Sequence, residues 1–112
     1  RAQDAGGAQG MPLIGAYDIA PLTPRAISAT AEGADIRVAV ALRADLTVSG
    51  VRIWRSLQSV EAWTDASGLL DAAPSARVVW LDVAPGAGPW RYRATAETAD
   101  GVSSLPSAEA TP

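Results

Sequence analysis

The sequence predicts an all-β sandwich of about seven short strands with an extended N-terminal arm, and three observations support this fold class. Bulky apolar residues alternate with small or charged residues in several stretches, as in strands that bury one face. Turn residues, mostly Gly and Pro, separate these stretches at intervals of about 8–12 residues. No apolar stripe with a period of about 3.6 residues is long enough to predict a helix.

The chain divides at residues 21–24 (PLTP), where two Pro residues favour extended backbone. Residues 1–20 are expected to form a linker or N-terminal arm, because Gly, Ala and Gln dominate their first half. Residues 13–20 are apolar enough for a short edge strand that could pair with a neighbour. Residues 21–112 are expected to form the sandwich.

The strands of the sandwich follow from alternation and from β-forming residues. The stretches expected to form them are 36–42, 51–56, 77–83 and 90–97. Turns are expected at Glu32-Gly33, at the Gly- and Pro-rich residues 85–89, and at Asp100-Gly101. Residues 56–76 have no clear period, so no strand is assigned to them.

The same alternation predicts the core. The side chains expected to meet between the sheets are Ile36, Val38, Val40 and Leu42 from one sheet and Val51, Ile53, Tyr92 and Ala94 from the other. Because the chain has no Phe, its four Trp residues are expected to contribute core volume. A buried Tyr92 is expected to direct its hydroxyl to a polar partner near a sheet edge.

Missing residue types exclude much chemistry. The chain has no His, Cys, Lys, Asn or Phe, and all nine basic residues are Arg. These absences exclude disulfides, thiol nucleophiles, imidazole ligands and Schiff-base lysines. Twelve acidic residues give a net charge of −3, which argues against nucleic acid as a partner. The sequence therefore predicts a protein that is not an enzyme and that binds no cofactor and no metal. It also predicts no membrane span, because no apolar run is long enough to cross a bilayer.

Residues 90–107 (WRYRATAETADGVSSLPS) resemble the last two strands of a fibronectin type III domain. That family has an aromatic-x-Tyr-x-x-x-Ala strand, a Gly turn and then Ser-x-Pro-Ser. The matching residues are Trp90, Tyr92, Ala96, Gly101, Ser104, Pro106 and Ser107.

Earlier segments agree with this resemblance in their order. PLTP at 21–24 is similar to the proline-led first strand, and VRIWRS at 51–56 to the third strand of bacterial and phage members. Asp82 with Pro85-Gly86 is similar to the acidic residue and loop before the penultimate strand. The resemblance covers residues 21–112 and implies an immunoglobulin-like sandwich. The core signature expected for it is Ile36, Val38, Val40, Ile53, Trp90, Tyr92 and Pro106.

Two Trp residues are candidate ligand contacts. Trp54 has the parity opposite to Ile53, and Trp63 lies in the unassigned region, so both could present an indole face to a sugar. The alternative is that they fill a core without Phe, which is the role expected for Trp80 and Trp90.

Arg52, Arg91 and Arg93 are candidate partner contacts, because the resemblance implies that their two strands pair. The Arg residues expected on faces opposite the core are Arg37, Arg43, Arg52, Arg55, Arg91 and Arg93. Such a stripe could bind a phosphate-bearing or acidic partner. The alternative is a solvated face on which Arg residues pair with acidic residues across strands.

Carboxylates are the only general acid–base candidates that remain. Asp65, Asp71 and Asp82 could pair as in glycoside hydrolysis, but nothing in their spacing requires it. No catalytic residue is therefore assigned.

The resemblance implies a structural and recognition module within a larger protein. Alanine- and arginine-rich modules of this style resemble those of tail-tip or host-specificity proteins of phages and phage-like particles. We therefore expect a virion or particle-tail component that acts as a spacer and host-surface adhesion domain. Its expected partners are other domains or subunits of the assembly and a cell-surface glycan. The alternative is an accessory spacer or weak carbohydrate-binding module of a secreted polysaccharide-active enzyme.

Overall fold

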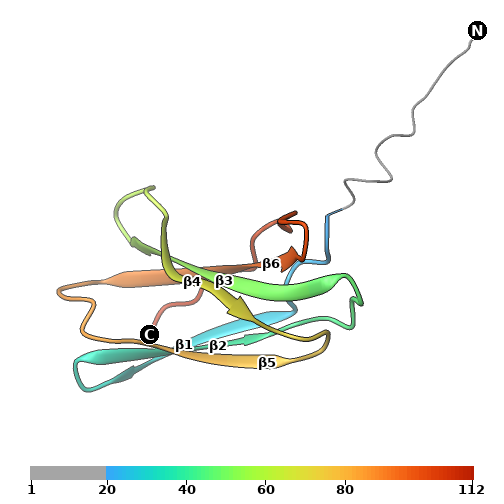
Figure 1. Ribbon diagram of the computed structural model, residues 1–112. Coiled ribbons are helices and arrows are strands. Elements are labelled where there is room, and N and C mark those ends of the chain that lie inside the picture. Colours follow the sequence, from blue (N-terminus) through green and yellow to red (C-terminus); the bar gives the residue numbers. More distant parts are fainter. Residues whose placement is uncertain (1–19) are drawn as a thin grey trace, which may run out of the picture.

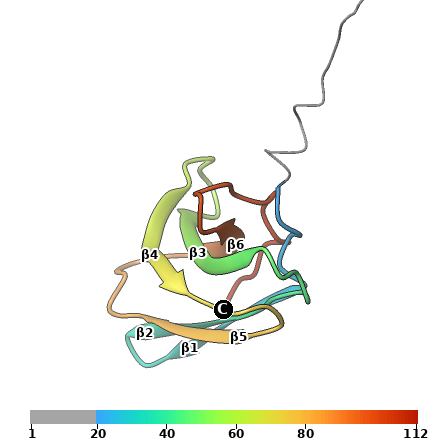
Figure 2. The ribbon, with the colours of Figure 1, turned by 45° about the vertical axis from the view of Figure 1, so that its right-hand side comes forward.

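The structure, a computed structural model, describes residues 20–112. They form six strands in two antiparallel three-stranded sheets that face each other as two layers (Figures 1 and 2). The strand orders are β1-β2-β5 and β4-β3-β6. The strands are β1 (Ala26–Glu32), β2 (Asp35–Ala41), β3 (Val48–Leu57), β4 (Thr64–Asp71), β5 (Arg77–Asp82) and β6 (Trp90–Thr98). The all-β class is confirmed, whereas the arm and the short strand expected before residue 20 lie outside the described residues.

The core lies between β2 of one sheet and β3 and β6 of the other. Val38 and Val40 on β2 are fully buried, because alternate residues of a strand point to the same face. Val51 and Ile53 on β3 and Tyr92 on β6 face them and are also fully buried. Burial of each large apolar side chain contributes about 1.5–3 kcal/mol, so this layer holds the sheets together. The other members of the core are Ile36, Leu42, Val48, Ala94 and Ala96.

The first strand begins later than the resemblance implies. Pro21 and Pro24 are buried, but they precede β1, which starts at Ala26. Pro has no N–H to donate to a sheet. Pairing therefore begins just after Pro24, where Arg25 N donates to Ala41 O at 2.7 Å.

β4 lies where the sequence predicts no strand. Its register against β3 shifts between Arg52 and Trp54, and Gly68 has a φ of +69°. Such a bulge interrupts the period of two, which hides the strand from pattern analysis. Gly50 of β3 permits the close approach of β4, because a Cβ there would lie 3.0 Å from the backbone oxygen of Leu70.

An irregular segment, residues 103–110, takes the place of a seventh strand. It runs antiparallel beside β6 and forms two isolated bridges, between Tyr92 and Ala110 and between Glu97 and Ser103. The described residues therefore contain six strands, one fewer than the sequence predicts.

Two buried serines attach this segment to β6. Ala96 N donates to Ser104 Oγ and Ala94 N donates to Ser107 Oγ, both at 2.9 Å. The serine amides donate in return to the carbonyls of the same Ala residues at 2.8 Å. Pro106, which the sequence places in the core, is exposed. Both serines bond to backbone groups along the edge of β6. Leu105 and Pro106, which lie between them in the chain, are exposed to solvent.

The described chain starts and finishes at opposite ends of the sandwich (Figure 1). Leu22 N donates to Asp45 Oδ2 at 2.7 Å, beside the loop that follows β2. Pro112 lies near Gly33, in the turn that precedes β2. Because β2 runs from that turn to that loop, the two sites are a strand length apart. We call them the N-terminal end and the C-terminal end of the sandwich.

Candidate functional site

The five candidate contact residues lie together on the outer face of the β4-β3-β6 sheet. Arg52 and Trp54 are on β3, Arg91 and Arg93 are on β6, and Trp63 directly precedes β4. Trp54 is the register partner of Arg93, so the pairing of β3 with β6 brings these side chains to one side. All five are partly buried. We call these five residues the outer cluster.

The ring of Trp63 contacts two guanidinium groups. The Cζ atoms of Arg93 and Arg91 lie 4.1 and 4.7 Å from its ring centroid. Its indole N–H donates to Glu61 Oε2 at 3.0 Å. Cation–π contacts of this kind contribute about 0.5–1 kcal/mol at exposed sites. Trp63 therefore fixes the segment before β4 against β6.

Trp54 is also fixed on this face, because its indole N–H donates to Thr95 Oγ1 at 3.1 Å. The other two Trp residues are on the inner side, where Trp80 and Trp90 are half-buried against the core. Trp90, which the sequence places in the core, is therefore only partly buried there. It lies at the start of β6, where its indole N–H donates to Gly86 O at 3.1 Å.

Arg52 is paired with two carboxylates. Its Nε donates to Glu97 Oε2 at 2.6 Å, and its Nη1 contacts Asp65. These bonds, first the one with Glu97, raise the pKa of Arg52 above its ordinary value. The Glu97 side chain is only 8% exposed, so little water screens the pair. Arg52 is thus bound to acidic partners within the chain.

Arg91 is paired as well. Its Nη2 donates to Glu61 Oε1 and to Val60 O, both at 2.8 Å, and its Nη1 lies 3.2 Å from Glu109 Oε1. The Arg91 bond is the main cause that lowers the pKa of Glu61, followed by the bond from Trp63. The same bond raises the pKa of Arg91.

Arg93 differs from Arg52 and Arg91 in its partners. Among residues 20–112, no acidic side chain lies within ion-pair distance of it. Its guanidinium group therefore keeps donors available for an anionic group, beside the indole of Trp63. The rest of the cluster matches the alternative of cross-strand pairs on a solvated face.

The remaining Arg residues do not join this face. Arg37 pairs with Glu32 at 2.6 Å on the other sheet, and Arg43 Nε donates to Thr23 O at 3.1 Å. Arg55, which the sequence places opposite the core, faces inward instead, because it shares the parity of Ile53 on β3.

Arg55 belongs to a buried polar group that pattern analysis does not identify. Its Nη1 lies 2.8 Å from both carboxylate oxygens of Asp82, and Tyr92 Oη donates to Asp82 Oδ2 at 2.7 Å. Asp82 is on β5, whereas Arg55 and Tyr92 are on β3 and β6, so the group joins the two sheets. Burial, followed by the bond to Asp82, raises the pKa of Tyr92. We call these three residues the inter-sheet clamp.

The three Asp residues considered for catalysis are in different places. Asp65 pairs with Arg52 on the outer face, Asp71 is exposed at the end of β4, and Asp82 is in the clamp. They do not form the pair that glycoside hydrolysis requires.

Residues 20–112 contain no group of three acidic, His or Cys side chains arranged to hold a metal ion. Over the same residues, no helix has the length and apolarity to span a membrane.

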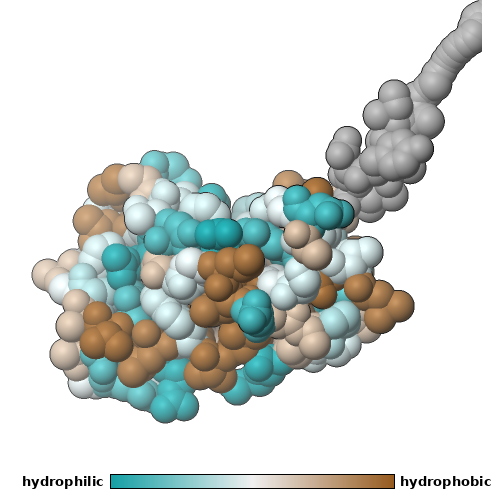
Figure 3. All heavy atoms as spheres, viewed as in Figure 1, coloured by the Kyte–Doolittle hydropathy of each residue, from teal (hydrophilic) through white to brown (hydrophobic). Residues whose placement is uncertain are grey.

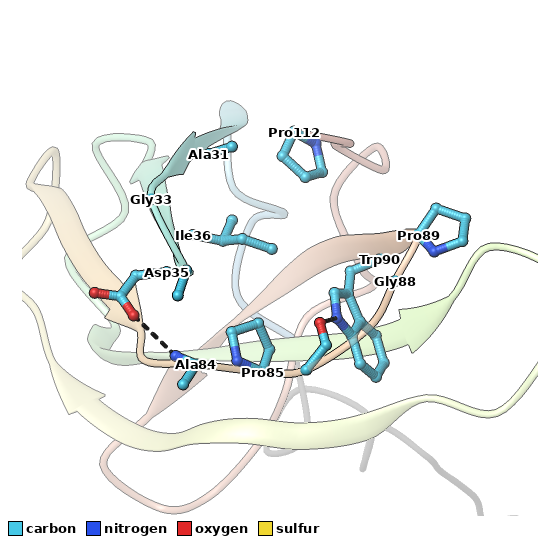
Figure 4. A pocket seen from close by; sticks show the side chains of 12 residues that line it. Ala31, Gly33, Asp35, Ile36, Ala84, Pro85, Gly88, Pro89, Trp90 and Pro112 are labelled. Carbon is cyan, nitrogen blue, oxygen red and sulfur yellow. Dashed lines mark hydrogen bonds between the residues drawn. The ribbon is translucent and has the colours of Figure 1, made fainter.

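A hollow of about 440 Å³ lies at the C-terminal end, between the β1–β2 turn and the β5–β6 loop (Figure 4). Its apolar lining includes Ile36, Trp90 and three Pro residues. The hollow exists because both loops carry mainly Gly, Ala and Pro, which do not fill the space. Asp35 is its one charged residue, and Asp35 Oδ1 already accepts a bond from Ala84 N at 2.9 Å.

Compared with known proteins, the chain matches no family model and no curated sequence.

Proposed function

We propose that the chain is a non-catalytic fibronectin type III-like module of a larger phage or phage-like tail protein, where it acts as a spacer and recognition unit. The distribution of strands supports the fold: the first, second and fifth are in one sheet, and the third and sixth are in the other. Residues 103–110 lie beside the sixth. Immunoglobulin-like sandwiches distribute their strands in this way.

The path of the chain is the observation that carries the spacer role. The chain enters the sandwich at the N-terminal end and leaves at the C-terminal end (Figure 1). β3, with 10 residues, spans about 33 Å, so modules joined in series would each extend the protein by roughly that length.

Both terminal segments are tied to the sandwich, which gives the spacer a fixed direction. At the N-terminal end, Leu22 N bonds to Asp45 and Thr23 O accepts a bond from Arg43. At the C-terminal end, Tyr92 and Ala110 exchange two backbone bonds of 2.8 Å. The segments on either side of the module would therefore leave it from opposite ends of the sandwich.

The outer cluster is the surface proposed for recognition. Arg93 has donors for an acidic group, and Trp54 and Trp63 place indole rings on the same face. Trp54 also supports the second candidate, an accessory carbohydrate-binding module of a secreted polysaccharide-active enzyme, because its indole lies on this face, whereas the ring of Trp63 is already in contact with Arg91 and Arg93.

The coding sequence on either side of this segment tests the proposal. We expect tail-tip or tail-hub domains in the same reading frame, and we expect mass spectrometry to detect the chain in purified particles. A neighbouring glycoside hydrolase domain, with the chain found in the culture medium and not in particles, would overturn the tail assignment in favour of the second candidate.

Retention of the purified chain on host cells tests the recognition role. Arg93→Gln is expected to lower retention several-fold, because it removes a charge that has no acidic partner among residues 20–112. Arg37→Gln is the matched control, since Arg37 pairs with Glu32 on the opposite sheet. Equal retention of the two variants would contradict a role for the outer cluster.

A further inference from the structure

Three of the four sheet edges carry features that oppose pairing with another strand. β1 exposes polar side chains, including Thr30 and Glu32. β4 carries a bulge and the charged residues Asp65 and Asp71. The edge of β6 is covered by residues 103–110.

The fourth edge, that of β5, has less protection, because its two charged residues, Arg77 and Asp82, stand at the ends of the strand. Between Arg77 and Asp82 the strand contains neither Pro, Gly nor a charged residue. Val79 and Leu81 point outward with exposed fractions of 49% and 40%, and Val83 follows at 68%. Figure 3 shows apolar side chains gathered over β5.

The backbone of β5 is also free on this side. Residues 77–82 pair with β2, and within the described part of the chain none of residues 77–83 takes part in a backbone hydrogen bond outside that pairing. The outer N–H and C=O groups of β5 can therefore accept an added strand.

We infer that β5 pairs with β5 of a second copy of this chain, antiparallel about a two-fold axis. An axis perpendicular to the sheet keeps the outward residues of both copies on one face. With Trp80 on the axis, Val79 of one copy lies opposite Leu81 of the other, and Arg77 lies opposite Val83. The outward row of β5 is thus complementary to itself, which favours a second copy over an unrelated strand.

The pairing would join the two sheets into one of six strands, in the order β1-β2-β5-β5-β2-β1. A ladder of one short strand is much smaller than the roughly 800 Å² per partner of a stable complex. The dimer is therefore expected to be weak and to depend on protein concentration.

Sedimentation velocity of the full chain over a concentration series tests the association. We expect the weight-average mass to rise toward that of a dimer, and we expect the double variant Val79→Lys/Leu81→Lys to remain monomeric. Leu46→Lys and Leu105→Lys are matched controls, because these leucines are 91% and 76% exposed on other elements. A wild-type chain that is monomeric throughout, or a dimer that persists in the double variant, would overturn the inference.

Disulfide trapping tests the register, since the chain has no Cys of its own. In the proposed register a Cys at position 79 lies opposite position 81 of the partner, at about 4.5–5.5 Å between Cα atoms, which a disulfide can span. Two copies of position 79 are about 8 Å apart, which is beyond that reach.

Mild oxidation of Val79→Cys mixed with Leu81→Cys is therefore expected to give several-fold more dimer than either variant alone. Leu105→Cys measures random collisions, and circular dichroism shows that each variant is folded. Equal trapping in the mixture and in the single variants would overturn the register and the two-fold pairing.

Discussion

Among the described residues, the carboxylate of Asp82 is the one acidic group in the inner layer, and it takes its partners from the opposite sheet. Asp82 is 4% exposed and receives bonds from Arg55 and Tyr92. A buried charge is tolerated when its partners remain in place, and removal of one partner leaves the others uncompensated. The clamp therefore favours one alignment of β5 against β3 and β6 over shifted alignments, which would leave buried polar groups without partners.

Replacement of Tyr92 separates the contribution of its hydroxyl from that of its ring. Tyr92→Phe removes the bond to a charged group and is expected to lower the free energy of unfolding by about 1.5–3 kcal/mol. Tyr92→Ala also leaves a cavity and is expected to lower it by about 3–5 kcal/mol. Urea denaturation measures both, with the exposed Ser28→Ala as a control near zero. A loss under about 0.5 kcal/mol for Tyr92→Ala would contradict its place in the core.

The raised pKa of Tyr92 gives the fold an alkaline limit. The unfolded chain ionises this phenol at about pH 10, whereas the folded chain resists ionisation. This part of the stability is therefore fully present below about pH 10 and declines as the pH rises further. In Tyr17→Phe, which leaves Tyr92 as the single Tyr, tyrosinate absorbance should appear together with loss of the β-sheet signal. Ionisation near pH 10 with the fold intact would contradict this expectation.

Among the elements, the segment 103–110 is held by side chains where a strand would use backbone groups alone. The hydroxyls of Ser104 and Ser107 occupy positions beside β6 that keep two alanine amides satisfied. Each hydroxyl also donates to the carbonyl of the next residue. The segment therefore protects the edge of β6 without forming a regular ladder.

Ser107→Ala tests this attachment. It leaves Ala94 N buried without an acceptor, and the free energy of unfolding is expected to fall by about 1–3 kcal/mol. Leu105→Ala, at a side chain that is 76% exposed, is expected to change it by less than about 0.5 kcal/mol. Thermal unfolding of both variants provides the measurement, and similar losses would argue against the role of the hydroxyl.

Strands that bury one face in the core could be predicted from the sequence. β4, whose bulge and position depend on its pairing with β3, could not. The sequences of β2 and β6 alternate between core-facing apolar residues and other residues, because each strand turns one side to the core. β4 has a bulge and its position depends on Gly50 of its partner strand, which no local pattern records. Parity places Arg52 and Trp54 outside and Arg55 inside, so the outward position expected for Arg55 rested on its charge and not on its parity. Its carboxylate partner, Asp82, is 27 residues away, and no local pattern records it. The acidic partner of Arg91, Glu61, is similarly 30 residues distant.

At the scale of the whole molecule, force applied through the two ends would load both terminal elements in shear. β1 runs away from the N-terminal end, antiparallel to β2, and residues 103–110 run toward the C-terminal end, antiparallel to β6. Tension along the axis would therefore stretch several hydrogen bonds of each element at once.

Single-molecule pulling with introduced cysteines tests this geometry. Handles at Ala20→Cys and Pro112→Cys load the ends in shear. Handles at Ser59→Cys and Ala87→Cys flank the last register pair, Leu57 with Trp90, and would open β3 from β6 one bond at a time. The unfolding force is expected to be clearly higher for the first pair. Equal forces would argue against a module that bears tension.

The position of the inter-sheet clamp also determines the order in which the molecule opens. Arg55, Asp82 and Tyr92 all lie near the C-terminal end, because β3 and β5 finish there and β6 begins there. The N-terminal end is closed by bonds such as that of Leu22 to Asp45, which are exposed to water. Partial opening in the native state therefore starts at the N-terminal end. Amide protons there should exchange fastest, and those around the clamp should exchange only when the whole sandwich unfolds.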